Sequence, residues 1–360
     1  MSLDLNTLLA SVTRRNASDL HLAVGSPPVI RYDGNLIYLK EMGILMDEDV
    51  EGVLSSILSP MQMKKYQATH ELDFSFAYKG PDGKEDRFRG NAYYSLSKMS
   101  AAFRLIPPVI RTIDDLNLPP ILKEISKKRR GLFLVTGPTG HGKSTTLAAI
   151  VREINHMRDD HIITIEDPVE FVHTPVRCLI NQREIGTDTA SFAEGLKRAM
   201  RQDPDVILIG EMRDLETIAA AVTAAETGHL VFGTLHTQDA AQSIDRLVDV
   251  FPTNQQEQIR IQLASVLIGI CSQQLIPKGD GSGDSRICAT ELLISNPAVK
   301  NCIREGKTSQ IKTLIQTGVS LGMHTMEQCL ATFVQNGMLP REAAFTYTYD
   351  SKELQRILGK

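Results

Sequence analysis

The chain has 360 residues, with 39 lysines and arginines against 43 aspartates and glutamates. This length allows two or three domains with a substantial core, and the slightly acidic balance argues against a protein that coats nucleic acid. The five scattered cysteines form no Cys-x-x-Cys pair, which indicates reduced packing residues of a cytoplasmic chain rather than disulfides or a zinc site. The first residues do not resemble a signal peptide. No apolar run reaches the ~18 residues of a membrane span, so we expect any membrane association to go through a protein partner.

Residues 1–106 carry strand and helix signals without a phosphate-binding loop. Asp33-Gly34 predicts a hairpin, and Gly80–Gly83 predicts a second turn. Asp47 is expected to cap a helix that ends near Pro60. Alternating apolar residues predict strands over residues 19–24, 29–32, 35–39, 72–78, 87–94 and 101–106. Together these signals predict a small α+β domain.

Residues 107–120 contain four prolines, which cannot continue a helix or a central strand, so this segment is expected to be a linker or hinge. A short helix and the basic tract Lys127–Arg130 follow. Such a tract is usually the solvated end of an element, and a phosphate or partner contact is the alternative.

From residue 131 to about residue 235, apolar runs alternate with helical segments, which predicts a parallel sheet covered by helices on both faces. The remainder, from Gln238 onward, is expected to be mostly helical, with a Gly-rich turn at Gly279–Gly283 and a strand-like segment at Ile287–Ile294. The four runs in the sheet are Leu132–Val135, Ile162–Ile165, Val206–Ile209 and Leu230–Phe232.

The first of these runs opens into a glycine-rich loop of the form G-x-x-x-x-G-K-S, and apolar residues then recur at helical spacing. This is a Walker A loop in its required strand–loop–helix context, and a chance glycine-rich turn is the alternative. We expect backbone N–H groups to surround the β-phosphate of ATP, Lys143 to reach the β- and γ-phosphates, and the Ser144 hydroxyl to hold Mg²⁺. The predicted nucleotide-binding residues are Gly137, Pro138, Thr139, Gly140, His141, Gly142, Lys143, Ser144 and Thr145.

Carboxylates follow two of the predicted strands. Glu211 follows the apolar run Val206–Ile209 after a single glycine, Gly210. This is the pattern of a Walker B acid, which holds Mg²⁺ directly or through water. Glu166, Asp167 and Glu170 follow the strand before it. Hydrolysis needs one carboxylate to orient and deprotonate water, and the residues alone do not choose among these three.

Two histidines and three arginines complete the candidates. His229 and His236 bracket a strand and make a poor metal site, so structural roles are the default and contact with the γ-phosphate is the alternative. Arg87, Arg89 and Arg104 lie on predicted strands, where arginines are usually solvated. In a ring-shaped NTPase they can instead complete the neighbouring subunit's site.

With these residues assembled, the chain resembles the PilT family of type IV pilus retraction ATPases, within the secretion ATPase superfamily. The resemblance implies a PAS-like N-terminal domain (1–106), a flexible linker (107–120) and a RecA-like ATPase domain with a helical C-terminal part (121–360). The blocks that carry it are Ala17–Leu22, Arg87–Arg89, the Walker A loop, Thr164–Glu170 (the Asp box), Asp203–Asp214 and Glu226–Thr237 (the His box).

The resemblance also implies roles for single residues. Glu170 becomes the base that activates water and Glu211 the Walker B acid, while His229 and His236 become γ-phosphate or interface sensors. The three arginines become contacts to nucleotide. Ala298–Glu305 is similar to the family's AIRNLIRE motif, which is tied to retraction. His141 stands where the family usually has serine, and we expect altered kinetics at most.

The implied function is a homohexameric, ATP-hydrolysing motor for pilus retraction and twitching motility. It would be cytoplasmic, at the inner face of the cytoplasmic membrane, and would dock on an inner-membrane platform protein, with a second retraction ATPase as a further partner. The alternatives are an accessory retraction ATPase, or a pilus assembly or type II secretion ATPase, whose usual tetracysteine element is not visible here. A nucleic-acid translocase is disfavoured by the acidic charge and the lack of tryptophan. A non-hydrolysing module is disfavoured by the presence of Glu170 and Glu211.

Overall fold

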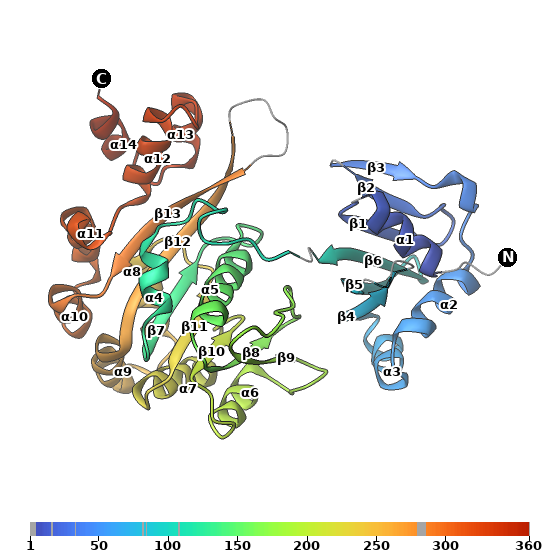
Figure 1. Cartoon of the computed structure of the whole chain (residues 1–360), viewed down its shortest axis with the longest axis horizontal. Helices are drawn as coiled ribbons and strands as arrows, with labels where there is room; N and C mark the ends of the chain where they lie inside the picture. The colour runs from blue at the N-terminus through green and yellow to red at the C-terminus, as the bar shows by residue number, and fades with distance from the viewer. Residues whose placement is uncertain are drawn as a thin grey trace. The chain divides into compact units, whose positions relative to one another are not determined.

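The computed structural model describes residues 5–15, 17–32, 34–80, 83, 85–106, 109–278 and 286–359. The chain divides into two compact units (Figure 1). The first comprises Met1–Val109 and Pro168–Phe171, and the second comprises Ile110–Asp167 and Val172–Lys360. The predicted features at Asp33-Gly34, Gly80–Gly83, Pro107-Pro108 and Gly279–Gly283 lie wholly or partly outside the described residues.

The described residues of the first unit form a six-stranded antiparallel sheet in the order β3-β2-β1-β6-β5-β4. One hydrophobic core joins this sheet to its helices, with Tyr66, Phe88 and Phe103 fully buried. The strands are β1 (Asp19–Ala23), β2 (Val29–Tyr32), β3 (Asn35–Tyr38), β4 (Glu71–Lys79), β5 (Glu85–Ser95) and β6 (Lys98–Ile106). The helices are α1 (Leu5–Arg15), α2 (Asp47–Ile57) and α3 (Pro60–Thr69), with a 3₁₀ turn η1 (Lys40–Met42).

The expected cap of α2 is wrong by one residue. Met46 holds the N-cap position, and its backbone N–H donates to Asp49 Oδ2 at 2.9 Å, while Asp47 is the first helical residue. Pro60 does not merely end α2, because it starts α3 at the favoured first position. Ser59 caps α3 by accepting a hydrogen bond from Gln62 N. The sequence patterns did not predict α1 or α3.

The described residues of the second unit form a seven-stranded sheet in the order β13-β12-β7-β11-β10-β8-β9. All neighbours in it pair in parallel except β12 and β13. Leu132 and Leu134 pack into one hydrophobic cluster while Phe133 and Val135 pack into another, so β7 is buried on both faces. The strands are β7 (Gly131–Thr136), β8 (His161–Glu166), β9 (Leu179–Glu184), β10 (Val206–Ile209), β11 (Leu230–Leu235), β12 (Leu267–Pro277) and β13 (Arg286–Ile294).

Helices cover this sheet on both faces (Figure 1). They are α4 (Ile121–Ser126), α5 (Lys143–Met157), α6 (Phe192–Ala199), α7 (Leu215–Glu226), α8 (Ala240–Asp249), α9 (Thr253–Val266), α10 (Pro297–Arg304), α11 (Ile311–Thr317), α12 (Met326–Gln335), α13 (Arg341–Tyr347) and α14 (Ser351–Leu358). Two 3₁₀ turns, η2 (Thr308–Gln310) and η3 (Val319–Leu321), flank α11. None of the helices in the described part of the chain is long and apolar enough to cross a membrane.

The expectation of a mostly helical region after Gln238 missed β12. Leu263, Val266, Leu267 and Ile270 recur at helical spacing, although α9 ends at Val266 and the chain continues as a long strand. The polar run Ser272–Gln274 interrupts the apolar pattern, yet all three residues are buried. This strand lies beside β7 and becomes part of the nucleotide site.

Candidate functional site

The candidate residues gather at one edge of the second unit's sheet. Because β7, β8, β10 and β11 are parallel neighbours, their carboxyl ends meet at the same edge. The loop after β7 contains Gly137–Gly142, Glu166 ends β8, Glu211 follows β10, and His236 follows β11.

The Walker A loop connects β7 to α5, and two of its glycines are required by its path. Gly137 has φ 141°, and a Cβ there would lie 2.3 Å from the carbonyl oxygen of Gln273. Gly142 has φ 82° and is the N-cap of α5. A side chain at either position would strain the loop, so the chain can pass close to β12 only with glycine here.

Lys143 is buried and folds back over the loop. Its Nζ donates to the carbonyl oxygens of Gly137 at 2.8 Å and Pro138 at 3.0 Å. Ser144 and Thr145 occupy the first turn of α5, where backbone N–H groups and the positive end of the helix dipole favour an anion. This end of α5 therefore has the donors and the charge that a bound phosphate needs.

Side-chain hydrogen bonds from β12 hold the phosphate loop and the strand and helix that flank it. The buried Gln273 donates from Nε2 to the carbonyl oxygen of His141 at 2.6 Å and accepts from Thr146 Oγ1 at 2.9 Å. Thr136, at the end of β7, donates to Ser272 Oγ at 2.8 Å. Gln273 thus links the loop to the first turns of α5, and no sequence motif pointed to it.

His141 also contacts β12. Its Nδ1 accepts the backbone N–H of Leu275 at 3.1 Å, so the ring must carry its proton on the other nitrogen. Burial lowers the pKa of His141, and the nearby charges of Lys143 and Arg286 lower it further. The residue that departs from the family's usual serine is therefore a neutral tether between the loop and the sheet.

Glu211, His236 and Thr139 form a second network at the same edge. Glu211 is mostly shielded, and its Oε1 lies 2.8 Å from His236 Nε2 and also pairs with the guanidinium of Arg213. His236 Nδ1 lies 3.3 Å from the hydroxyl of Thr139 in the Walker A loop. The predicted Walker B acid and one predicted sensor are thus connected to the phosphate loop through side-chain contacts.

The three carboxylates of the Asp box have different surroundings. Glu166 Oε1 accepts from Thr164 Oγ1 at 2.6 Å and from Gln182 Nε2 at 3.2 Å, which ties it to the sheet. Asp167 is exposed. Glu170 belongs to Pro168–Phe171, the short segment that groups with the first unit.

The predicted arginines lie on the neighbouring strands β5 and β6 of the first unit, where Arg89 pairs with Arg104. Arg87 Nη2 donates to Ser75 at 2.7 Å, and Arg104 Nε donates to Asp19 at 2.8 Å. Arg89 Nη1 lies 4.0 Å from Glu170 Oε1 within the same unit. Arg89 and Arg104 keep a large part of their side chains exposed.

His229 does not join this cluster. It precedes β11, whereas His236 follows it, and Leu230 pairs with Gly131 at the amino edge of the sheet. Its Nδ1 lies 2.9 Å from the carbonyl oxygen of Ala224 and 3.2 Å from the Thr227 hydroxyl. Within one chain, His236 therefore lies beside the phosphate loop, whereas His229 lies at the opposite edge of the sheet.

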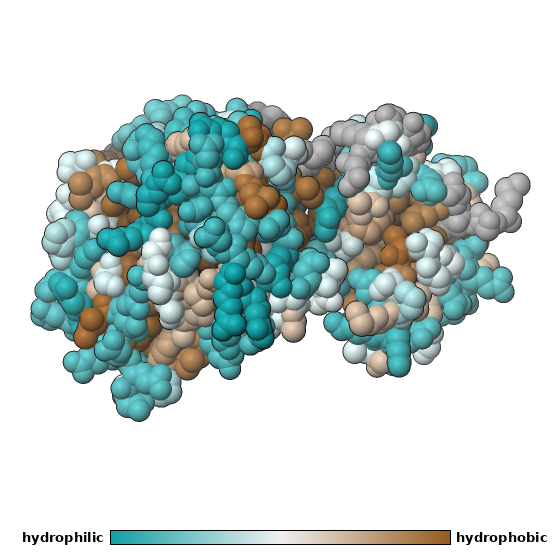
Figure 2. All heavy atoms as spheres, turned by 60° about the horizontal axis from the view of Figure 1, so that its bottom comes forward, coloured by the Kyte–Doolittle hydropathy of each residue, from teal (hydrophilic) through white to brown (hydrophobic). Residues whose placement is uncertain are grey.

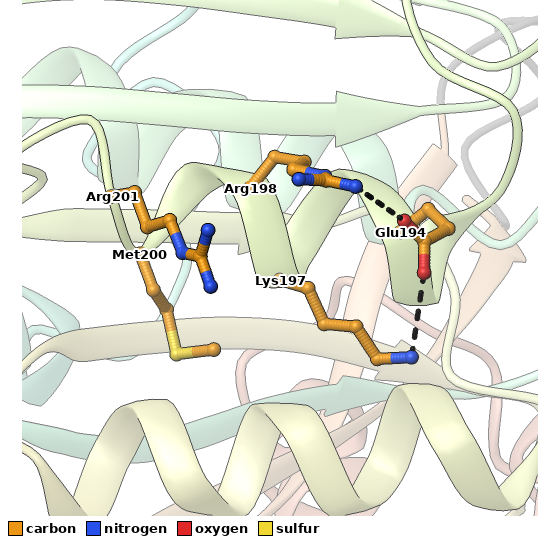
Figure 3. Close-up of a pocket in the computed structure, with 5 residues that line it drawn as sticks. All are labelled: Glu194, Lys197, Arg198, Met200 and Arg201. Atoms are coloured by element: carbon orange, nitrogen blue, oxygen red, sulfur yellow. Dashed lines mark hydrogen bonds and ion pairs between the residues drawn. The ribbon is translucent and has the colours of Figure 1, made fainter.

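Two other observations limit the possible sites. No group of three or more His, Cys, Asp or Glu residues that could hold a metal ion occurs in the described ranges. A shallow pocket of about 340 Å³ lies along α6 (Figure 3). Its Lys197 and Arg198 both pair with Glu194, so two of its three cations are already partly neutralised.

Comparison with known proteins agrees with this geometry. Residues 112–336 match the model of the Type II/IV secretion system protein family. The type IV pilus retraction ATPase PilT of Pseudomonas aeruginosa is 47% identical over 342 residues, which span 95% of this chain and 97% of that protein. The chain belongs to the PilT family. It is a PilT-type, ATP-binding P-loop ATPase of the secretion ATPase superfamily.

Two further relatives within the family differ in name and similarity. The type IV pilus ATPase PilU of Pseudomonas aeruginosa is 35% identical over 356 residues, covering 99% of this chain and 91% of PilU. The crystal structure of the pilus retraction motor PilT with bound ADP superposes with a TM-score of 0.90 at 45% identity, covering 98% of this chain and 99% of that one. The expected α/β fold, with an α+β N-terminal domain and a parallel-sheet ATPase domain, is confirmed.

Proposed function

We propose that this chain is an ATP-hydrolysing motor that powers type IV pilus retraction and twitching motility. The support comes from relatives named for pilus retraction that match almost the whole chain. Within the chain, the observation that carries the proposal is the contact of Glu211 with His236 and of His236 with Thr139. A Walker B acid linked to the phosphate loop suits hydrolysis rather than passive binding.

The proposed roles follow from charge and position. Lys143 exchanges its loop carbonyls for the β- and γ-phosphates of ATP, and the Ser144 hydroxyl and Glu211 hold Mg²⁺, the latter directly or through water. His236 donates toward the γ-phosphate from the edge of β11. Mg²⁺ supplies charge neutralisation, while the chain's own groups bind and orient the nucleotide.

Glu170 is proposed as the base that activates water, because Glu166 is already engaged by Thr164 and Gln182. We propose that the chain forms a homohexamer in which Arg87, Arg89 or Arg104 reaches the nucleotide of a neighbouring subunit. Their strand positions and the exposure of Arg89 and Arg104 support this role. For His229, we propose the role of a sensor at the interface with the neighbouring subunit.

The domain boundaries belong to this proposal: residues 1–106, a hinge at 107–120 and an ATPase domain over 121–360. The division of the chain between Val109 and Ile110 supports a hinge at the start of the linker. Ile113 and Leu118 are buried in the core of the second unit, so we expect bending before these residues. The remaining partners are an inner-membrane platform protein and a second retraction ATPase, at the cytoplasmic face of the membrane.

The decisive experiment deletes the gene, complements it with wild type or Lys143→Ala, and counts surface pili. We expect abundant pili without twitching in the deletion strain and in the Lys143→Ala strain. Lys127→Ala, an exposed lysine in the same unit, serves as the control and restores twitching. Bald cells would identify an assembly ATPase, and unchanged pili with normal twitching would identify an accessory one.

A further inference from the structure

A pocket of the second unit lies at the edge of the sheet opposite the nucleotide site. It has a volume of about 720 Å³ and is lined by the beginnings of β7 and β12 and the end of β13. The basic tract Lys127–Arg130 contributes Lys128 and Arg130 to it, and α10, which carries most of the Ala298–Glu305 block, contributes Lys300. Two segments far apart in the sequence therefore place cations around one hollow, here called the amino-edge pocket.

The charges of this pocket are not balanced. Of its two acids, Glu124 is paired with Lys127 at 2.6 Å, whereas Glu226 accepts from the neutral Gln262 at 2.9 Å and keeps its charge. Lys128, Arg130 and Lys300 make no ion pair or side-chain hydrogen bond with any residue in the described part of the chain. The pocket therefore presents cations without partners.

Helix ends reduce this positive charge without cancelling it. α4, α7 and α9 end at or beside the pocket, and each carboxyl end carries roughly half a negative charge. The three helix ends and the Glu226 carboxylate together contribute roughly two and a half negative charges, and the three cations of the pocket still exceed this by about half a charge. The balance at the mouth of the pocket thus favours an anionic ligand.

Apolar side chains lie between the cations. Ile121, Ile268 and Ile294 line the pocket and are partly exposed. In Figure 2, the visible face of the molecule likewise carries small hydrophobic patches separated by hydrophilic side chains rather than one broad apolar surface. A ligand that fits this lining alternates carboxylates with apolar groups, and the volume is far larger than a single phosphate needs.

We propose that the amino-edge pocket docks an acidic, partly apolar segment of a partner protein. Arg130 and Lys300 are the two anchors, contributed by opposite parts of the chain, and Lys128 adds charge beside them. The pocket is separated from the phosphate loop by the length of β7. Docking there leaves the nucleotide site accessible. Such docking does not depend on the pilus being the structure that the motor acts on.

The test uses the purified full-length chain and a short fluorescent peptide of Glu-Glu-Leu repeats, with a Gln-Gln-Leu peptide as its uncharged counterpart. We expect anisotropy to report binding of the Glu peptide alone, weakened by added KCl. Arg130→Glu and Lys300→Glu are each expected to weaken it by at least about tenfold. Arg201→Glu, which reverses an exposed cation in the α6 pocket (Figure 3), should leave it unchanged.

Any one of four outcomes would overturn the proposal. The Glu peptide fails to bind, or it binds equally well to the Arg130 and Lys300 variants. If sodium pyrophosphate displaces the Glu peptide at constant ionic strength, the pocket is a site for small anions. If Arg130→Glu or Lys300→Glu disrupts the oligomer in sedimentation, the pocket is an interface between copies of this chain. ATP turnover, measured in parallel, is expected to stay at the wild-type rate in both variants, so a failure of docking is distinguishable from a failure of the ATPase.

Discussion

Replacing Gln273 with alanine tests whether β12 is part of the nucleotide site. The change removes the hydrogen bonds to the His141 carbonyl at 2.6 Å and from the Thr146 hydroxyl at 2.9 Å. Each is worth about 1 kcal/mol, and the buried Thr146 hydroxyl loses its acceptor at a further cost of about 1–3 kcal/mol. Because that hydroxyl can turn to a backbone carbonyl within α5, we expect the free energy of unfolding to fall by about 2–4 kcal/mol.

The functional consequence is specific to the loop. Without Gln273, the His141 carbonyl has no donor from β12, so the loop samples more conformations before it binds phosphate. We expect KM for ATP to rise by roughly tenfold, which corresponds to about 1.4 kcal/mol. Steady-state phosphate release measures KM, and urea unfolding measures stability.

Gln274→Ala is the matched control, because this neighbouring glutamine is also buried but points to the other face of β12, near Tyr349. It should lower stability and leave KM for ATP unchanged. Gln273→Glu keeps the acceptor for Thr146 but sets an oxygen against the His141 carbonyl, so it should raise KM without leaving a cavity. A wild-type KM in Gln273→Ala would refute the role assigned to β12.

The remaining predictions concern turnover and stability. Glu211→Gln should reduce ATP hydrolysis by at least about a hundredfold while fluorescent ATP still binds, and turnover within a few fold of wild type would exclude Glu211 as the Walker B acid. Burial raises the pKa of Glu291 from 4.5 to about 7, so the folded state binds more protons than the unfolded state between these values. Stability should therefore fall as pH rises through this window. Glu291→Gln keeps an acceptor for Ala240 N and should be about 3 kcal/mol more stable than wild type at pH 8. If the unfolding free energies of variant and wild type change in parallel with pH, this prediction is wrong. Lys312→Met leaves the buried Glu353 carboxylate, 2.7 Å away, without its counter-charge and should cost about 2 kcal/mol in urea unfolding, less than for a fully buried pair because Lys312 is 40% exposed. An unchanged midpoint would mean that Gln316 alone satisfies Glu353.

The sequence predicted the parts of the site that depend on local pattern. A strand buried on both faces is an apolar run, and a phosphate loop needs glycines at fixed spacing, so β7, the Walker A loop and Glu211 were all identifiable from the order of the residues alone. The same locality explains the errors at α2. Asp47 suits an N-cap position in a sequence pattern, but the backbone places Met46 there and makes Asp47 the first helical residue.

The contacts of β12 could not be predicted this way. Thr136 meets Ser272 across 136 positions of sequence, and Thr146 meets Gln273 across 127. A buried glutamine in a polar run has no motif, because its significance comes from which strand lies beside it. The separation of His229 from His236 was foreseeable, since seven steps of extended chain at about 3.3 Å each place them roughly 23 Å apart.

The loop is thus held from two sides by contacts of different kinds. The tether to β12 is partly buried and uses Gln273 and the neutral His141, whereas the contact between Thr139 and His236 is exposed and 3.3 Å long. Hydrogen bonds in a buried, low-dielectric site are stronger than exposed ones. If the proposed role of His236 is right, we expect an incoming γ-phosphate to replace the exposed contact between Thr139 and His236 first and to leave the tether to β12 in place. During a cycle of binding and hydrolysis, we then expect the contacts of His236 and Glu211, at the ends of β11 and β10, to change, while β12 keeps the loop fixed to the sheet.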